Sequence, residues 1–428
     1  MSTIGIGILG GGTVGGALAR RLLNEREAIG AKAGLDLELR KVAVRSLGKD
    51  RSFDTADGLL TDRAGDVIAD PEIDLVVELL GGLEPAGSLV LEALRSGKPV
   101  VTANKELVAA RGVELFEAAA EAGVSLLFEA AVGGGIPIIR PLSQSLAGER
   151  VTRVLGIVNG TTNYILTQMA DEGLAYDVAL EEAQMLGFAE ADPTADVSGA
   201  DAASKAAILA SLAFGTWISG DAVFREGIER LDAIDLRFAA DLGYTVKLLA
   251  IAESIGGGVC VRVHPTMVGS DHPLASVRGP QNAIYLEGPA IGQLMFSGPG
   301  AGGEPTATAV LGDIIDGARE LLAGAPVSPK VRFQPGRIVD FSEAPTKWYL
   351  RLEVEDAPGV LASIAGAFGD HGVSLGSVWQ DGRGTDATLL LVTHDAPEGS
   401  LRNAVASLGS LGTVKEVAAT IRVHSDEP

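Results

Sequence analysis

The side chains best suited to acid–base chemistry in this sequence are Asp201 and Lys205, which lie four positions apart. They fall at the start of a run that predicts a helix over residues 202–214. The spacing places the acid and the amine on one helical face, within reach of each other and of a shared ligand. Taken alone, the pair has a second interpretation, a solvated surface ion pair on a helix capped by Ser198.

The pair ends a stretch that is rich in carboxylates. Between Gly187 and Lys205, four acidic residues fall within twelve positions, although the flanking sequence is mostly Ala, Leu and Gly. These acidic residues are Glu190, Asp192, Asp196 and Asp201. Whether they serve a ligand depends on the elements that position them, and Asp192 and Asp196 receive no role from the sequence.

A glycine-rich turn near the N-terminus lies between a predicted strand, residues 4–9, and a helical pattern, residues 17–23. This is the context that the G-x-G-x-x-G fingerprint of dinucleotide-binding proteins requires. The first glycine permits the tight turn, the second lets the backbone approach a pyrophosphate, and the third allows close helix packing. The helix N-terminus favours phosphate. A glycine turn without chemistry is the alternative. The expected nucleotide contacts are Gly10, Gly12, Thr13, Val14 and Gly15.

Strand and helix patterns alternate after this turn. Strands are predicted at residues 37–44, 75–80, 100–102 and 125–129, and helices at residues 88–95 and 106–122. Such alternation predicts an α/β fold with a parallel sheet covered by helices on both faces. We therefore expect an N-terminal Rossmann-type domain over residues 1–136.

Two basic residues follow predicted strand ends in this domain. Arg45 stands where a site that prefers NAD usually offers an acidic residue, so it favours NADP by accepting a 2′-phosphate. The alternative is that Arg45 is a surface arginine and that the protein uses both cofactors. Lys105 follows the strand that ends at Thr102, and ligands of open parallel sheets bind beyond the carboxyl ends of strands. Thr102 and Lys105 are thus expected at the cofactor crevice, although a surface lysine remains an equal alternative from position alone.

The segment from Glu129 to Pro137 contains three consecutive glycines. Glycines after a strand end allow backbone carbonyls to turn inward, where they can hold a hard cation together with the Glu129 carboxylate. On spacing alone, a turn between two domains is the more common structure.

The middle of the chain, residues 137–330, is expected to form an α+β substrate and dimerisation domain. Its predicted strands are residues 153–158, 259–268 and 283–286, and its helices begin at Tyr164 and cover residues 176–186 and 202–214. Polar residues 159–163 between the first strand and helix suggest the floor of a ligand site. A second glycine-rich loop, residues 297–306, opens a helix at residues 307–322 that we expect to return to the nucleotide domain.

Residues 347–428 predict a small C-terminal module after a proline-containing linker at residues 342–346. The expected order is strand 348–354, helix 360–368, strands 373–380 and 388–394, helix 401–408 and strand 414–423. The order βαββαβ is that of a ferredoxin-like sandwich.

The amino-acid composition argues against some classes of binding partner. The 428 residues carry 34 Lys and Arg against 56 Asp and Glu, a net charge of −22. An acidic surface argues against nucleic acid and anionic membranes as partners. The single cysteine, Cys260, lies in a strand-like run and is interpreted as a core residue. With neither a basic leader nor a long apolar run, a cytoplasmic protein is expected.

Several motifs together resemble the homoserine dehydrogenase family over essentially the whole chain. They are the glycine turn, Thr102-Ala-Asn-Lys105, the segment 156–165, Gly187-Phe-Ala-Glu-Ala-Asp-Pro with Asp201 and Lys205 in register, and Gly298-Pro-Gly-Ala-Gly-Gly. The resemblance implies the NAD(P)H-dependent, reversible reduction of L-aspartate 4-semialdehyde to L-homoserine, in the synthesis of threonine, methionine and isoleucine. Because the glycine turn begins at residue 10, we do not expect a kinase domain before it.

The resemblance also implies roles for single residues. Lys205 matches the catalytic lysine, Lys105 lies beside nicotinamide and substrate, Asp201 positions the substrate, and Glu190 receives its amino group. Gly187 and Gly302 match positions that line the cofactor. A structural sodium site is implied at Glu129, Val132, Gly134 and Ile136. The chemistry agrees, because an ammonium beside an aldehyde oxygen stabilises developing negative charge and can deliver a proton.

The C-terminal run from Leu350 resembles an ACT domain, which implies feedback inhibition, most simply by threonine, through a site near residues 356–360. An ACT domain kept only for oligomerisation, in a homodimer or homotetramer, is the alternative. Two rival functions stay open: a non-catalytic amino-acid sensor, and a dehydrogenase of another amino-acid-derived carbonyl.

Overall fold

The computed structural model describes residues 3–324, 333–381 and 387–424. The chain forms two compact units, each assembled from three segments. The first contains Met1–Val151, Ala207–Gly220 and Asn282–Pro335, and the second contains Thr152–Ala206, Asp221–Gln281 and Gly336–Pro428. The predicted domain end at residue 330 lies outside the described residues.

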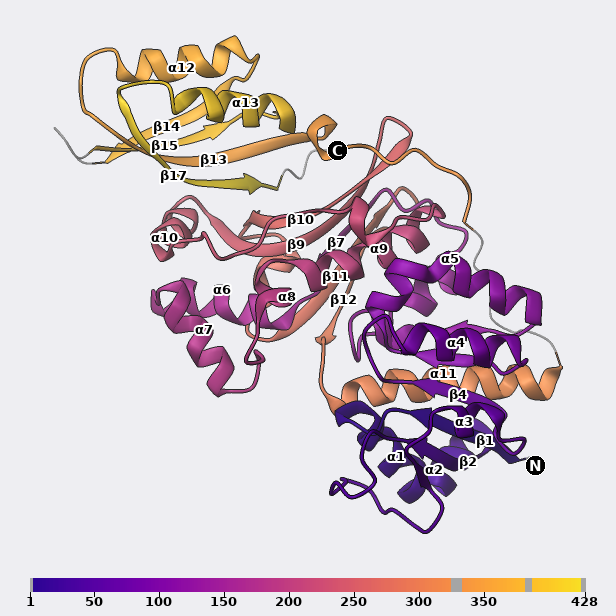
Figure 1. Cartoon of the computed structure of the whole chain (residues 1–428). Coiled ribbons are helices and arrows are strands. Elements are labelled where there is room, and N and C mark those ends of the chain that lie inside the picture. The colour runs from indigo at the N-terminus through magenta and orange to yellow at the C-terminus, as the bar shows by residue number, and fades with distance from the viewer. Residues whose placement is uncertain (1–2, 325–332, 382–386, 425–428) are drawn as a thin grey trace. The chain divides into compact units, whose positions relative to one another are not determined.

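A six-stranded parallel sheet forms the centre of the first unit (Figure 1). Its order is β3 (Leu60–Thr61), β2 (Asp36–Ala43), β1 (Thr3–Leu9), β4 (Leu75–Glu78), β5 (Val100–Thr102) and β6 (Leu126–Leu127). In β1 and β2 the register pairs Leu9 with Ala43, so both strands end at one edge of the sheet. The predicted Rossmann-type fold is confirmed.

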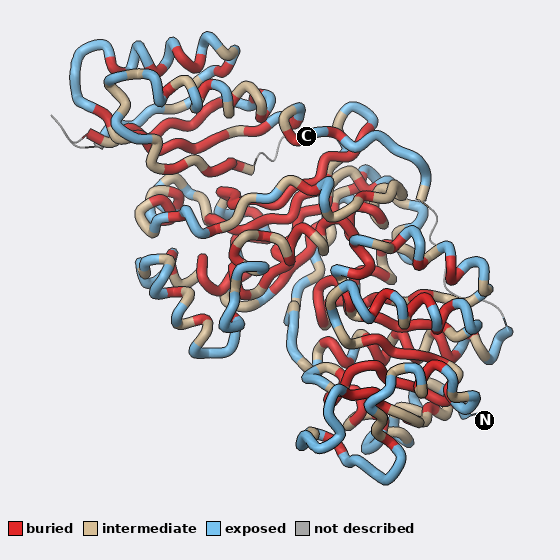
Figure 2. The backbone as a smooth tube through the Cα atoms, in the orientation of Figure 1, coloured by how far each residue is buried: buried red, intermediate tan, exposed pale blue. Residues whose placement is uncertain are grey.

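Helices cover both faces of this sheet, as the alternating pattern predicts. They are α1 (Thr13–Asn24), α2 (Arg26–Ala33), α3 (Gly65–Ala69), α4 (Ala86–Arg95), α5 (Lys105–Ala122) and α11 (Gly303–Ala323). One buried cluster joins β1 and β2 to α1 and α11, and a second joins β4 and β5 to α3, α4 and α5. Figure 2 shows mostly buried backbone in the centre of this unit, where β4 and β5 are buried along their whole length. Thus α11 shares a core with β1 and α1, although some 290 positions separate α11 from α1.

Shorter elements complete the first unit. They are the 3₁₀ turn η1 (Glu129–Ala131), the π turn η2 (Pro141–Ser145), and the strands β11 (Gln281–Gly288) and β12 (Gly292–Pro299). Glu129 therefore belongs to a 3₁₀ turn and not to the predicted strand 125–129, because β6 ends two residues earlier at Leu127.

The second unit contains an extended sheet in which β7 (Arg153–Ile157), β9 (Tyr244–Ile255), β10 (Gly258–Gly269), β17 (Val414–Val423), β13 (Pro345–Val354), β15 (Ala387–Thr393) and β14 (Leu375–Asp381) are neighbours in that order. The short strands β8 (Phe224–Arg225) and β16 (Ala396–Pro397) pair with β10 and β13. Strand β9, which the sequence did not indicate, pairs with β10 over twelve residues. The C-terminal strands thus continue the sheet of the middle segment.

The helices of the second unit are α6 (Gly160–Glu172), α7 (Tyr176–Met185), α8 (Thr194–Val197), α10 (Ala233–Asp241), α12 (Val360–Asp370) and α13 (Glu398–Leu408), with short 3₁₀ turns η4 (Pro273–Ser276) and η5 (Phe341–Glu343). Helix α9 (Ala200–Phe214) begins in this unit, and η3 (Gly220–Ala222) lies at a boundary. Helix α6 begins four residues before the predicted Tyr164, because Asn159 supplies its N-cap.

The C-terminal module has the predicted order β13, α12, β14, β15, α13, β17. Figure 1 shows α12 and α13 on one face of its sheet. The predicted linker at residues 342–346 is partly wrong, since β13 already begins at Pro345. Among the described residues, no helix has the length and apolarity needed to span a membrane.

Candidate functional site

The pair Asp201 and Lys205 lies at the start of α9, and the two side chains form an ion pair. The Lys205 Nζ lies 2.6 Å from Asp201 Oδ2 and 2.8 Å from the carbonyl oxygen of Val158, just beyond β7. The side chains are only 8% and 12% exposed for Asp201 and Lys205. This pair is therefore withdrawn from water, which argues against the alternative of a solvated surface pair.

Asn159 connects this pair to a second carboxylate. Its Nδ2 donates to Asp201 Oδ2 at 2.9 Å and to Asp196 Oδ1 at 2.7 Å, while its Oδ1 caps α6 by accepting from the Thr162 amide. Burial, and then the charge of Asp201, raise the pKa of Asp196, against the lowering effect of the Asn159 hydrogen bond. We call Asn159, Asp196, Asp201 and Lys205 the lysine cluster. Sequence reasoning assigned no role to Asp196 and did not single out Asn159.

The predicted cap of α9 is wrong. Ser198 has helical backbone angles and ends α8 as its C-cap. Gly199, with φ of +78°, follows it, and its carbonyl accepts from the Ala203 amide. Two short helices therefore meet at Gly199, and the turn between them presents Asp196 and Asp201 to the same asparagine.

The other polar side chains of segment 159–163 have separate structural tasks. Asn163 is buried, donates to the carbonyls of Val277 and Gly279, and accepts from Lys247. Thr161 donates to the carbonyl of Phe188 at 2.6 Å, which ties the stretch carrying Glu190 to α6. Of these polar residues, Asn159 is the one that contacts the lysine cluster, and the ligand floor stays a prediction.

Glu190 itself is exposed, and the hydrogen-bonded lysine cluster does not include it. Its backbone carbonyl accepts from Gln184, which belongs to α7. Gly187 ends the same helix with φ of +77°. The structure therefore joins Asp201 to Lys205 but leaves the predicted amino-group ligand at the surface.

The glycine turn of the first unit has the geometry of a phosphate cradle. Gly10 has φ of +110°, and a β-carbon there would lie 2.6 Å from the carbonyl oxygen of Leu79. A β-carbon on Gly15 would lie 1.9 Å from the carbonyl oxygen of Gly10, so both positions require glycine. Around Gly12 a β-carbon would meet no atom within 4 Å. Gly12 is also the N-cap of α1 and supplies no side-chain cap, which leaves the first amides, including Thr13 and Val14, directed outward.

The second glycine-rich loop lies beside this turn, as expected. Gly302, with φ of +117°, is the N-cap of α11. A β-carbon on the next residue, Gly303, would lie 3.2 Å from the Thr13 carbonyl oxygen. Arg20 of α1 also pairs with Glu304 in the first turn of α11.

Arg45 is exposed just beyond the carboxyl end of β2, next to the glycine turn. A second arginine also reaches this turn. Arg51 donates from Nη1 to the Gly11 carbonyl at 2.9 Å and from Nη2 to the Ser46 carbonyl at 2.6 Å. The sequence signal for these arginines was the run of basic residues after the second strand. Only the folded loop shows that Arg51 is the residue that turns back to the glycine turn.

Buried polar bonds at the ends of β4 and β5 position Lys105. Glu78 is fully buried and accepts from the Thr102 hydroxyl at 2.6 Å and from the amides of Leu80 and Gly81. Thr102 in turn accepts from the Asn104 amide, and Asn104 caps α5, whose first residue is Lys105. Sequence reasoning did not identify Glu78. The signal for it was a carboxylate at the end of an apolar strand.

The predicted cation loop has a more specific arrangement than its spacing suggested. The Glu129 carboxylate accepts three backbone amides, those of Ile138, Ile139 and Arg140, at 2.6–2.8 Å. Gly134 has φ of +56°, and a β-carbon there would lie 2.3 Å from the Gly300 carbonyl oxygen. The Glu129 side chain is therefore first a cap for the following turn.

Comparison with known proteins identifies the family of this chain. A family model described as homoserine dehydrogenase matches residues 137–315, and the NAD-binding domain of homoserine dehydrogenase matches residues 10–129. The ACT domain model matches residues 348–413. The homoserine dehydrogenase of Corynebacterium glutamicum is 46% identical, with 99% of this chain and 96% of that protein covered. The chain belongs to the homoserine dehydrogenase family.

Solved structures of homoserine dehydrogenases support this assignment. The enzyme from Thiobacillus denitrificans is 42% identical, with a TM-score of 0.94 and 99% of each chain covered. A hyperthermophilic archaeal homoserine dehydrogenase in complex with NADPH is 31% identical, with a TM-score of 0.62, 77% of this chain and 100% of that chain covered. As a homoserine dehydrogenase, the protein is an oxidoreductase that uses NAD(P). The bare N-terminus of α1 and the open space at Gly12 fit the phosphates of that nucleotide.

We expect Asn159 to act as a positioning residue for Lys205. Both Asn159→Ala and Asn159→Ser should lower kcat by about ten- to a hundredfold, the usual effect of removing a supporting partner. The serine variant keeps an acceptor for the α6 cap, so only the alanine variant should also lose about 1 kcal/mol of stability. Steady-state kinetics over pH and thermal unfolding of both variants measure this. Unchanged kcat and pH profile in Asn159→Ser would show that the asparagine serves only the helix.

Proposed function

We propose that the chain interconverts L-aspartate 4-semialdehyde and L-homoserine, with Lys205 as the group that serves the substrate oxygen. The observation that carries the proposal is the lysine cluster. An ammonium has three N–H donors, and bonds to Val158 and Asp201 account for two in Lys205. A third donor on a side chain that is 12% exposed suits a hydrogen bond to a small substrate.

The nucleotide supplies the hydride when it is bound, so the chain has to bind, orient and protonate. In the reducing direction, the Lys205 ammonium stabilises the negative charge that develops on the aldehyde oxygen, and it delivers the proton. Asp201 holds the ammonium in place through the 2.6 Å ion pair. Lys105 is proposed to contact substrate and nicotinamide, and Glu190 to receive the substrate amino group from its exposed position.

Replacing Lys205 with alanine should reduce kcat by about two to four orders of magnitude, because the proton donor and the positive charge are both lost. NADPH affinity, measured by fluorescence titration, should change less than about twofold. Lys32→Ala, an exposed lysine on α2, is the matched control. Near-normal turnover of Lys205→Ala would reject the assigned role.

NADP is the proposed preferred cofactor. The archaeal relative was solved in complex with NADPH. In this chain the Arg51 guanidinium lies at the glycine turn, and the exposed Arg45 follows the end of β2 beside it. Guanidinium groups match phosphate geometry through paired N–H donors.

Arg45→Ala and Arg51→Ala should each weaken NADPH binding by about tenfold while changing NADH binding much less. The measurement is KM for both cofactors with each variant. Arg63→Ala, which removes an exposed arginine of the same unit, provides the control. Equal weakening of NADPH and NADH would remove the argument for NADP.

A sodium ion is proposed in the loop of Val132, Gly134 and Ile136, whose carbonyls lie in a turn with positive φ at two glycines. A buried carboxyl group lies next to this loop, since Asp313 accepts from the Glu129 amide at 2.8 Å. Burial, and then the charge of Glu129, raise the pKa of Asp313 to about 8 beside this loop. We propose that Glu129 binds the sodium ion with its backbone carbonyl oxygen, because its carboxylate caps the next turn.

Sodium chloride should raise the thermal unfolding midpoint above that in choline chloride at equal ionic strength, since a ligand of the folded state alone stabilises it. Potassium chloride controls for cation size. Identical midpoints in the three salts would reject the sodium site.

The ACT domain is proposed to bind an amino-acid effector, threonine, near Asp356–Val360. A contact path leads from this domain toward the lysine cluster. Arg422 of β17 pairs with Glu226, and the Glu226 amide donates to Val263 in β10. Two residues on, Ile228 donates to the Val197 carbonyl at 2.9 Å, directly before α9.

Breaking the ion pair between Arg422 and Glu226 should therefore uncouple inhibition from catalysis. Glu226→Gln should raise the threonine concentration for half-inhibition by about tenfold, a coupling of the usual allosteric size. Glu343→Gln, at an exposed ion pair, is the control. Unchanged inhibition in Glu226→Gln would reject this route.

The proposed domains are residues 1–136 with the helix 307–322, residues 137–330, and residues 347–428. The proposed assembly is a homodimer or homotetramer, which sedimentation would distinguish.

A further inference from the structure

A fully buried carboxylate, Glu78, ends strand β4 of the first unit. Its Oε1 accepts from the backbone amides of Leu80 and Gly81 at 2.7 and 3.2 Å, and its Oε2 accepts from the Thr102 hydroxyl at 2.6 Å. The Thr102 oxygen already accepts from the Asn104 amide, so its hydroxyl proton is directed toward Glu78. A side chain that accepts three such bonds is held as an ionised carboxylate.

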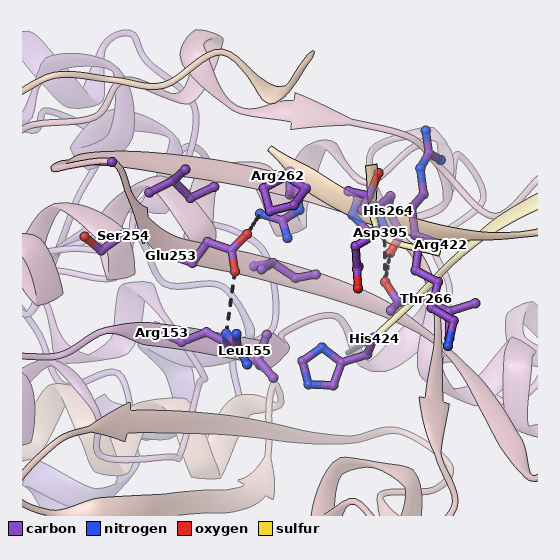
Figure 3. A pocket seen from close by; sticks show the side chains of 17 residues that line it. Arg153, Leu155, Glu253, Ser254, Arg262, His264, Thr266, Asp395, Arg422 and His424 are labelled. Atoms are coloured by element: carbon purple, nitrogen blue, oxygen red, sulfur yellow. Dashed lines mark hydrogen bonds and ion pairs between the residues drawn. The ribbon is translucent and has the colours of Figure 1, made fainter. Parts of the chain in front are cut away.

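These donors to Glu78 are uncharged, and Lys105, which begins α5 in the same network, is not among them. The carboxylate in the cavity drawn in Figure 3 differs, because Glu253 pairs with Arg262 at 2.6 Å and with Arg153 at 3.5 Å. Solvent and salt screen a buried charge much less than an exposed one. The negative charge of Glu78 therefore acts on groups beyond the end of β4.

The sheet order places Glu78 on one side of the nucleotide crevice. In the order β3-β2-β1-β4-β5-β6, the strand sequence reverses between β1 and β4, where dinucleotides bind across the carboxyl ends of the strands. In this fold the pyrophosphate lies at the first helix and the adenosine ribose at the end of the second strand. The nicotinamide half is therefore expected toward β4 and β5, whose last residues are Glu78 and Thr102.

The loop that follows Glu78 presents bare backbone. Gly81 and Gly82 have φ of +75° and +70°, and a β-carbon on either glycine would meet no atom within 4 Å. Asn104 holds this turn in place, since its Nδ2 donates to the Gly82 carbonyl at 2.7 Å. A planar ring can therefore approach the turn closely, with the Glu78 carboxylate behind the amides that the turn directs inward.

We propose that the Glu78 carboxylate stabilises the oxidised form of the bound nucleotide. A nicotinamide ring is neutral when reduced and carries one positive charge once its hydride has passed to the substrate carbon. A fixed negative charge on this side of the crevice lowers the energy of the cationic ring and leaves that of the neutral ring nearly unchanged. Glu78 thus favours hydride donation. The inference rests on nucleotide binding at the glycine turn, and neither on the identity of the substrate nor on a preference for NADP.

Fluorescence titration of the full chain with NADP⁺ and NADPH, and with NAD⁺ and NADH, tests the inference without turnover. Glu78→Gln removes the charge at constant side-chain length, so the ratio of Kd for the oxidised to the reduced form should rise by about tenfold. Glu78→Asp and Glu78→Asn repeat the comparison in a shorter side chain, and the asparagine variant should have the higher ratio. The second pair guards against a folding defect in Glu78→Gln. A disturbed loop alone would weaken both forms in proportion and leave the ratio unchanged.

Asp74→Asn is the matched control. Asp74 precedes the same strand at its opposite end and also accepts from a backbone amide, that of Gly5, at 2.7 Å. Its ratio should equal that of the unaltered chain, and thermal unfolding verifies that each variant is folded. The inference is overturned if neither pair of Glu78 side chains shows the change in ratio, or if Asp74→Asn raises the ratio equally. Failure of the unaltered chain to bind any of the four nucleotides would reject the nucleotide site itself, and this inference with it.

Discussion

The structure of the candidate active site depends on one constraint: a lysine and two carboxylates share a nearly buried space. Removing ammonium and carboxylate groups from water costs several kcal/mol for each ion unless partners replace the lost hydration. Asn159 solves this problem, because one amide donates to both carboxylates while its oxygen begins α6. The end of β7, the N-cap of α6 and the lysine cluster therefore form one arrangement. Protein contacts hold the lysine without enclosing it on every side.

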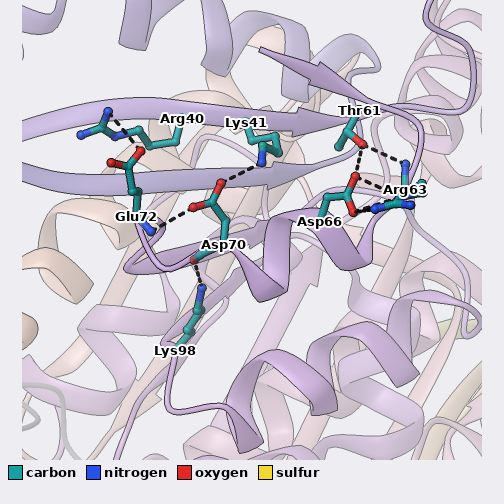
Figure 4. A network of polar contacts seen from close by, with 8 residues as sticks. All are labelled: Arg40, Lys41, Thr61, Arg63, Asp66, Asp70, Glu72 and Lys98. Carbon is teal, nitrogen blue, oxygen red and sulfur yellow. Dashed lines mark hydrogen bonds and ion pairs between the residues drawn. The ribbon is translucent and has the colours of Figure 1, made fainter. Parts of the chain in front are cut away.

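The same solution recurs in the first unit. Glu78 and Glu129 are both buried, and backbone amides at strand ends and turns satisfy each of them. These bonds fix the loops that lead to Lys105 and to the glycine loop near Gly134. The partly exposed network around Lys41, Asp70 and Lys98 differs in kind (Figure 4). There the Lys41 bond lowers the pKa of Asp70, but solvent and salt weaken such pairs, so the network ties β2 to α3 with little stabilisation.

Sequence reasoning succeeded where chemistry and local spacing coincide. The glycine turn, the four-residue interval before Lys205 and the alternating pattern each determine local geometry, and the fold class follows from them. It failed where a partner comes from a distant segment. Asn159 reaches Asp196, some 37 positions away, and Arg51 folds back to Gly11. The prediction that Ser198 caps α9 was wrong for a different reason. A capping pattern cannot reveal that another short helix ends at that serine.

The C-terminal module is bound to its unit by charges as well as by sheet pairing. Arg351 of β13 contacts Asp235 of α10 through two bonds, at 2.7 and 3.0 Å, and Tyr349 donates to the same carboxylate. Asp235 is fully buried, and its bonds raise the pKa of Arg351. A buried bidentate pair adds little net stability over apolar packing, yet misplacing it leaves an uncompensated charge, which is costly. The pair therefore restricts how the module docks, together with the pairing of Thr266 in β10 with Arg422 in β17.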